Sequence, residues 1–178
     1  NEGVKKVFIL MLPAIIAGGV AQINLLIDTV FASLLMTGSP TWLYVSDRLI
    51  QFPLGIFAIA IGTVLLPSLS SANQRGDLTL YKEQLRKSQR LVMFLAIPSV
   101  IGLALCSEHL ISTLFQRGEF FYTDVTQASK SLIAFSFGLP FFMMMKVLVP
   151  AFFSRKDTKT PMYAALAALA LNIILNYY

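Results

Sequence analysis

Five blocks of apolar residues, most of them near the length of a membrane-crossing helix, dominate this sequence. They cover residues 7–35, 41–69, 91–106, 131–153 and 160–178. A helix needs about 20 apolar residues to cross the ~30 Å hydrocarbon core of a bilayer. Apolar residues make up 56% of the chain and charged residues 13%, against roughly 45–50% and about 25% in soluble domains. We therefore predict an all-α membrane protein, a polytopic bundle of about five transmembrane helices.

The basic residues are concentrated in alternate connections between these blocks. Two Lys residues precede the first block, five Lys and Arg residues lie within 73–90, and three lie within 155–161. The segment 107–127 instead carries three carboxylates and one Arg. Because short basic loops stay in the cytoplasm, we predict a cytoplasmic N-terminus, a cytoplasmic amphipathic linker at 73–90 and a periplasmic connection at 107–127. This topology accounts for the basic residues, so we expect no nucleic-acid partner.

The two ends of the chain suggest that more sequence belongs to the protein. The first residue is Asn1 rather than Met, and the last, Tyr178, lies within an apolar block. Five spans rarely make a complete carrier. We therefore expect this sequence to be a piece of a larger membrane protein.

Arg48 is the most informative single residue, because it lies inside an apolar block next to Asp47. A fixed cation in hydrocarbon costs at least about 2.5–3.5 kcal/mol, so its side chain should face water, a partner charge or an anionic ligand. We expect Tyr44, Gln51 and Gly55 to share its helical face, with Asp47 turned by about 100°. The alternative is that Arg48 reaches the outer interface, which is only ~10 Å away along the helix.

Other polar residues inside the blocks occur in pairs or near an end. Asn24 and Asp28 are four residues apart and so share a helical face. Asn172 and Asn176 have the same spacing, which is typical of amides that bridge membrane helices. Cation coordination by their carbonyl oxygens is the alternative. Lys146 lies about two turns from the cytoplasmic end of its block, where it could snorkel to the interface or face a cavity.

Residues that would support catalysis are scarce. The single histidine, His109, and the single cysteine, Cys106, suit structural roles. No glycine-rich phosphate loop followed by Lys-Ser/Thr is present, so ATP use is not supported. An intramembrane enzyme would need its acid and base groups brought together, whereas the acids here are scattered over different blocks. We therefore predict that the protein is not an enzyme.

Several stretches of the sequence resemble one family of membrane carriers. The run Ser46-Asp47-Arg48-Leu49-Ile50-Gln51-Phe52-Pro53-Leu54-Gly55, continued through 62–70, resembles the eighth-helix signature of the lipid II flippases of peptidoglycan synthesis. This is the MurJ/MviN family of the multidrug/oligosaccharidyl-lipid/polysaccharide exporter superfamily. Supporting matches lie at 22–33, 114–120, 146–148 and 154–161. The resemblance covers essentially the whole chain, in order.

The resemblance implies that the chain is most of one lobe of a two-lobe exporter. Residues 1–178 would form spans seven to eleven of fourteen, a partial C-terminal lobe of six helices, and the missing N-terminal lobe would be its partner. The implied substrate is lipid II, an undecaprenyl-diphosphate-linked disaccharide-pentapeptide. The implied activity is transport of lipid II from the inner to the outer leaflet of the bacterial cytoplasmic membrane by alternating access. This transport would serve cell-wall synthesis, and membrane lipids would surround the protein.

The same resemblance implies two sets of binding residues. A substrate cavity suits cations, since the planar fork of an arginine grips a diphosphate with two hydrogen bonds. The residues expected to line this cavity are Arg48, Asp47, Gln51, Asn24 and Lys146. The second set is a sodium-ion site at Asp28, Asn172 and Asn176. Asn176 stands where the family has an acid, so this site lacks one carboxylate, and helix bridging stays the alternative.

Two other functions remain open at this point. The chain could belong to a related exporter of drugs or of another polyprenyl-linked oligosaccharide. A pump for cationic drugs would need acids in its cavity rather than Arg48 and Lys146. It could also be a structural scaffold, which the sequence of the missing lobe would decide.

Overall fold

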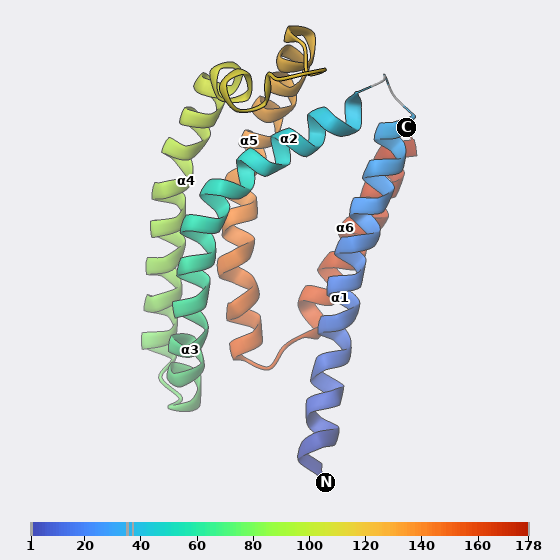
Figure 1. The fold of residues 1–178 in the computed structure, drawn as a ribbon. Helices are drawn as coiled ribbons and strands as arrows, with labels where there is room; N and C mark the ends of the chain where they lie inside the picture. The colour runs from blue at the N-terminus through green and yellow to red at the C-terminus, as the bar shows by residue number, and fades with distance from the viewer. Residues whose placement is uncertain (1, 35, 37, 178) are drawn as a thin grey trace. The chain divides into compact units, whose positions relative to one another are not determined.

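The computed structural model describes residues 2–34, 36 and 38–177 of the chain (Figure 1). The side chains of 2–10, 12–14, 17, 21, 176 and 177 lie outside that description, and with them the prediction for the side chain of Asn176. The elements are α1 (Glu2–Ser33), α2 (Ser39–Pro53), η1 (Leu54–Ile59), α3 (Ala60–Gln74), α4 (Leu78–Phe115), α5 (Tyr122–Ser154) and α6 (Lys159–Tyr177). Because α2, η1 and α3 follow without a break, the described residues form five continuous helices, which confirms the all-helical prediction.

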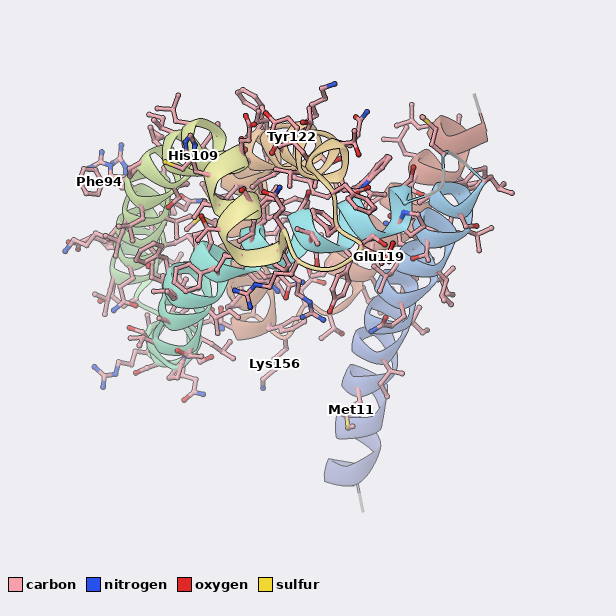
Figure 2. All side chains as sticks on the ribbon, turned by 45° about the horizontal axis from the view of Figure 1, so that its top comes forward. Met11, Phe94, His109, Glu119, Tyr122 and Lys156 are labelled. Carbon is pink, nitrogen blue, oxygen red and sulfur yellow. The ribbon has the colours of Figure 1, made fainter. Side chains whose placement is uncertain are left out.

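Three of the described helices are long and apolar enough to cross a bilayer. They are Ser39–Gln74, Leu78–Phe115 and Tyr122–Ser154, and a shorter apolar helix covers Lys159–Leu175. Their surfaces carry large apolar side chains: Leu105 is 77% exposed, Phe141 is 75% exposed, and Phe94 extends outward from α4 (Figure 2). Helices that are apolar on their outer faces suit a hydrocarbon solvent rather than water.

Helix α4 differs from the segments predicted for this part of the chain. The predicted linker 73–90 is helical from Leu78, continues without a break through the block 91–106, and ends only at Phe115. The Asp77 side chain accepts a hydrogen bond from the Leu80 backbone N–H at 2.9 Å, which caps the start of the helix. At 1.5 Å per residue the 38 residues extend about 57 Å, which exceeds the hydrocarbon thickness. The connection to α5 is therefore 116–121, shorter than the predicted 107–127.

The chain divides into two compact units. The first consists of Asn1–Thr37 and Phe152–Tyr178, and the second is Gly38–Ala151. Within the first unit, α1 and α6 lie side by side (Figure 1). The second unit holds α2, η1, α3, α4 and nearly all of α5, and it contains most of the buried apolar core.

Hydrogen bonds tie α2 and α4 to α5 within the second unit. They are Trp42 Nε1 to Asp124 Oδ1 at 2.8 Å, Ser46 Oγ to the Ala128 carbonyl at 2.9 Å, and Tyr81 Oη to the Ala151 carbonyl at 2.8 Å. Polar contacts of this kind hold helices together in membranes, where apolar burial alone gives little preference for protein over lipid. Ser46 is fully buried, so its contact lies inside the helix interface.

Replacing Ser46 with Ala should weaken the α2–α5 interface. The variant loses a buried interhelical hydrogen bond, worth about 0.5–1.5 kcal/mol, so we expect a lower midpoint of thermal unfolding for the full-length protein in detergent. The matched control is Ser136→Ala, because Ser136 is equally buried but bonds only to carbonyls of its own helix, Leu132 and Ile133. Equal destabilisation by both substitutions would contradict the interhelical role.

Candidate functional site

The long helix from Ser39 to Gln74 changes its hydrogen-bonding pattern near its middle. Pro53 is buried and has no backbone N–H to donate, and the next six residues, Leu54–Ile59, form a π-helix. Single π-helical turns inside α-helices are rare and frequently lie at functional sites. Residues before and within this turn line two separate cavities, one against α5 and one against α4.

The cavity against α5 contains polar side chains, and we call it the polar pocket. It has a volume of about 330 Å³. Its lining consists of Asp47, Ile50, Gln51, Leu54, Gly55, Ile59, Phe142 and Lys146. Gln51 Nε2 donates a hydrogen bond to Asp47 Oδ2, one helical turn earlier. The structure thus brings together three of the residues expected in a substrate cavity, namely Asp47, Gln51 and Lys146.

Close packing of α3 on α5 fixes the backbone at Lys146. A Cβ atom added at Gly62 would lie 3.0 Å from the Lys146 carbonyl oxygen, which is tighter than ordinary contact. Glycine therefore permits this approach of the two helices. Lys146 and Asp47 line the same pocket, but within the part of the chain that the structure describes they form no ion pair with each other.

Arg48 lies beside a different cavity, which we call the apolar cavity. Its volume is about 560 Å³, and it lies between the α2–η1 segment and α4. Its lining consists of Arg48, Leu49, Phe52, Pro53, Ile56, Phe57, Ser99, Leu103, Leu110, Leu114 and Phe115. The guanidinium carbon of Arg48 lies 4.8 Å from the centroid of the Tyr44 ring, which is a cation–π contact.

The predicted helical face is therefore divided between the two cavities. Arg48 lies with Tyr44 as predicted, but Gln51 and Gly55 line the polar pocket with Asp47, so the prediction that they share the face of Arg48 is wrong. Residues three apart differ by about 60° around a helix axis, and here that rotation separates Arg48 from Gln51. Phe142, one turn before Lys146, was not predicted, although its four-residue spacing from that lysine was a usable signal.

Asn24, the fifth expected cavity residue, belongs to the first unit together with Asp28 and Asn172. Asn172 Nδ2 donates a hydrogen bond to Asp28 Oδ1 at 3.0 Å, which joins α6 to α1. The Asn24 Oδ1 atom is buried and has no hydrogen-bond partner within the described part of the chain. No group of three or more His, Cys, Asp or Glu side chains that could hold a metal ion occurs among those residues.

These features define a class of protein. Long apolar helices with charged residues such as Asp47, Arg48 and Lys146 inside the predicted spans are characteristic of membrane carriers, in which such groups face a cavity or a substrate path. The sequence predicted no set of catalytic residues. The polar side chains of the polar pocket are one cation, one carboxylate and one amide. Binding of a polar group is the chemistry that this set can provide.

Comparison with known proteins identifies the family. The family model described as "Lipid II flippase MurJ" matches residues 1–178. The chain is 48% identical to the "Probable lipid II flippase MurJ" of Vibrio cholerae, covering 99% of this chain and 34% of that protein. It is 46% identical to the protein of the same name from Haemophilus influenzae, over 99% of this chain and 36% of that protein. It is 38% identical to the "Lipid II flippase MurJ" of Burkholderia cenocepacia, over 99% and 34%.

The chain belongs to the MurJ lipid II flippase family, which confirms the resemblance predicted from the sequence. It is a multi-pass membrane protein of the bacterial inner membrane, in a family of transporters rather than enzymes. The chain spans about a third of the length of these relatives.

The two cavities predict different access for water at neighbouring positions. In a cysteine-free full-length protein, Gln51→Cys should react several-fold faster with a water-soluble maleimide than Phe52→Cys. The reactive species is the thiolate, which forms readily only in a hydrated site. Phe52 is 71% exposed but borders the apolar cavity, so its exposure should be to lipid. Labelling rates would be followed by mass spectrometry, and equal rates would contradict the assignment of the polar pocket.

Proposed function

We propose that this chain is most of the second lobe of a carrier that flips lipid II from the inner to the outer leaflet. The observation that supports this most directly is the polar pocket, where the exposed side chains of Asp47, Gln51 and Lys146 line one cavity between α2 and α5. The names of the relatives supply the substrate. We place the N-terminus and the basic connections in the cytoplasm, because short basic loops stay on that side. The first lobe would close the cavity, and rocking of the lobes would expose it alternately to each side.

The charged groups divide the recognition of the substrate between them. The Lys146 ammonium carries a positive charge for an anionic group, while Asp47 and Gln51 offer hydrogen-bond acceptors and donors for sugar or peptide groups. Arg48 offers a planar fork that can hold a diphosphate through two hydrogen bonds. A pump for cationic drugs has less support, since Arg48 and Lys146 would repel its substrate. The lining of the polar pocket favours the cavity-facing interpretation of Lys146 over snorkelling.

Removing either cation should abolish function without preventing insertion. We expect full-length Arg48→Ala and Lys146→Ala to fail to support growth of a flippase-depleted cell, while immunoblots of membrane fractions show normal amounts. The matched control is Lys130→Ala, because Lys130 is an exposed cation on the same helix as Lys146 and lines neither cavity. Normal growth of both cation variants would exclude the proposed substrate site.

Sodium binding between α1 and α6 is a second proposal, supported by the oxygen atoms gathered there. The Asp28 carboxylate contacts Asn172, and the unpartnered Asn24 Oδ1 lies one helical turn from Asp28. Carboxylate and amide oxygens suit a hard cation, and Asn176 lies one turn beyond Asn172. A bound sodium ion would place a positive charge beside the Asp28 carboxylate, which favours the charged form of that group within a membrane. The ion would couple its own gradient to the carrier by favouring one state of the lobes.

Sodium should then stabilise the folded full-length protein. A ligand present at 100 times its Kd adds about 2.7 kcal/mol, so we expect sodium chloride, but not potassium chloride, to raise the midpoint of thermal unfolding. Asp28→Asn should remove this effect, whereas Asn172→Asp should enlarge it, because two carboxylates in contact need a cation. Asp47→Asn, in the polar pocket, is the control. Equal stabilisation by the two salts would contradict the proposal.

A further inference from the structure

A third cavity lies between α3 and α4, which run side by side (Figure 1). It has a volume of about 430 Å³, and none of its lining residues borders the polar pocket or the apolar cavity. It also lies apart from the oxygen atoms proposed to bind sodium, which belong to α1 and α6. We call it the α3–α4 cavity. Its volume is in the range of sites that hold a small molecule.

The lining of the α3–α4 cavity changes from polar to apolar along the two helices. Its end nearest the 75–77 connection carries Ser68 on α3 and Gln84 on α4, and the Ser68 hydroxyl donates a hydrogen bond to Gln84 Oε1 at 2.9 Å. Its far end is lined by apolar side chains, among them Ile61 and Leu91. Ser68 and Ile61 lie about 10 Å apart along the helix axis. A ligand that fills the cavity therefore needs one polar end and one apolar end.

Hydrogen-bond donors gather toward the polar end. Because Gln84 accepts the bond from Ser68 through its carbonyl oxygen, its amide N–H groups remain able to donate. Lys87 and Ser88, about one turn farther along α4, add an ammonium and a hydroxyl group to the lining. The described residues that line this cavity include no carboxylate. The oxygen atoms of a phosphate are suitable acceptors for such a set of donors.

The charge beside the cavity is positive. The Lys87 ammonium lies 2.7 Å from the Glu83 carboxylate, in an exposed ion pair on α4. Arg86 and Arg90 lie three and seven residues after Glu83, so they share that side of the helix. Three cations and one carboxylate leave a net charge of +2 on this side. An exposed ion pair is worth little, so an anionic ligand can replace Glu83 as the partner of Lys87.

Lys87 lies just outside the apolar part of α4. The apolar block 91–106 begins four residues later, about 6 Å along the helix, which is the depth of lipid headgroups when this block lies in hydrocarbon. We place the 75–77 connection in the cytoplasm, because short basic loops stay on that side. The leaflet nearest to Lys87 is then the inner one, whose anionic lipids attract basic residues at the membrane surface.

We propose that the α3–α4 cavity binds one anionic glycerophospholipid of the inner leaflet. Its phosphate would contact Lys87, with Gln84 and Ser88 as further donors, and an acyl chain would pass along Val64 and Leu91. Charge complementarity favours an anionic headgroup over a zwitterionic one. The choice of leaflet rests on the proposed cytoplasmic placement of the basic connections, whereas the site does not depend on lipid II as the substrate.

A fluorophore on the cavity lining can report which lipid lies there. In a cysteine-free full-length protein, Val64→Cys labelled with bimane reports on the α3–α4 cavity. Phe94→Cys labelled in the same way is the matched control, because Phe94 lines none of the three described cavities. The two native side chains are 73% and 74% exposed. Each protein would be placed in phosphatidylcholine vesicles that contain increasing fractions of a nitroxide-labelled lipid, which quenches a nearby fluorophore.

Phosphatidylglycerol should show a preference for the fluorophore at position 64 only. We expect its nitroxide derivative to quench that fluorophore at an about fivefold lower mole fraction than labelled phosphatidylcholine, the factor that one basic residue near an anionic surface gives. The fluorophore at position 94 should show no preference. Lys87→Gln should remove the preference at position 64. Lys82→Gln should keep it, because Lys82 is an exposed cation turned by about 140° around α4 from Lys87.

Four results would overturn the proposal. They are equal quenching by the two lipids at position 64, a preference that survives Lys87→Gln, an equal loss in Lys82→Gln, and stronger quenching by labelled phosphatidylethanolamine than by labelled phosphatidylglycerol. The last would assign the cavity to a zwitterionic lipid. Growth of flippase-depleted cells reports separately on the proposed function and shows that each variant folds. A Lys87→Gln protein that supports growth and has lost the lipid preference would support the phospholipid site independently of the substrate site.

Discussion

Packing of α2 against α5, with hydrogen bonds from Trp42 to Asp124 and from Ser46 to the Ala128 carbonyl, fixes how α2 is turned, and both cavities follow from that rotation. With Ser46 buried against α5, Asp47 and Gln51 line the side toward α5, while Arg48 lines the side toward α4. The Ser46 hydroxyl also bonds to the Trp42 carbonyl of its own helix at 2.8 Å, so it satisfies an acceptor on each side of the interface. The packing of this helix interface therefore places two adjacent charged residues beside different cavities.

The charged side chains within these apolar helices are not explained by stability. Lys146 and Asp47 share a pocket without forming a direct ion pair, and Arg48 has an aromatic ring as its described partner. Each such group is expensive in a membrane, and residues that break a local rule without compensation are expected at functional sites. The π-helix after Pro53 belongs to the same region, so backbone irregularity and unpaired charge coincide.

The chain spans about a third of the length of its relatives, and its polar pocket supplies few groups that could bind a large substrate. The chain covers 34% of the Vibrio cholerae protein, and a two-lobe carrier needs both lobes to enclose a substrate. The ligand that we propose carries a diphosphate and a large polar head, whereas the polar pocket presents one cation. Further cations from the rest of the protein would complete such a cavity. The contact of Asp28 with Asn172, formed within the first unit, does not depend on those missing parts.

The sequence alone determined the class of protein and its family, because apolar block length and the distribution of Lys and Arg are properties of the chain itself. Through the family resemblance it also placed Asp47, Gln51 and Lys146 within a predicted set of five cavity residues, and Asp28 with Asn172. It did not predict that α4 is one continuous helix. The residues change from polar to apolar near residue 91, whereas the helical backbone hydrogen bonds continue across that point. Nor did it predict which cavity Arg48 lines. Successive residues point about 100° apart around a helix, and the direction of each is fixed only when the helix packs against its neighbours. Tertiary contacts made that choice, because they alone supply partners for polar groups that lipid cannot satisfy.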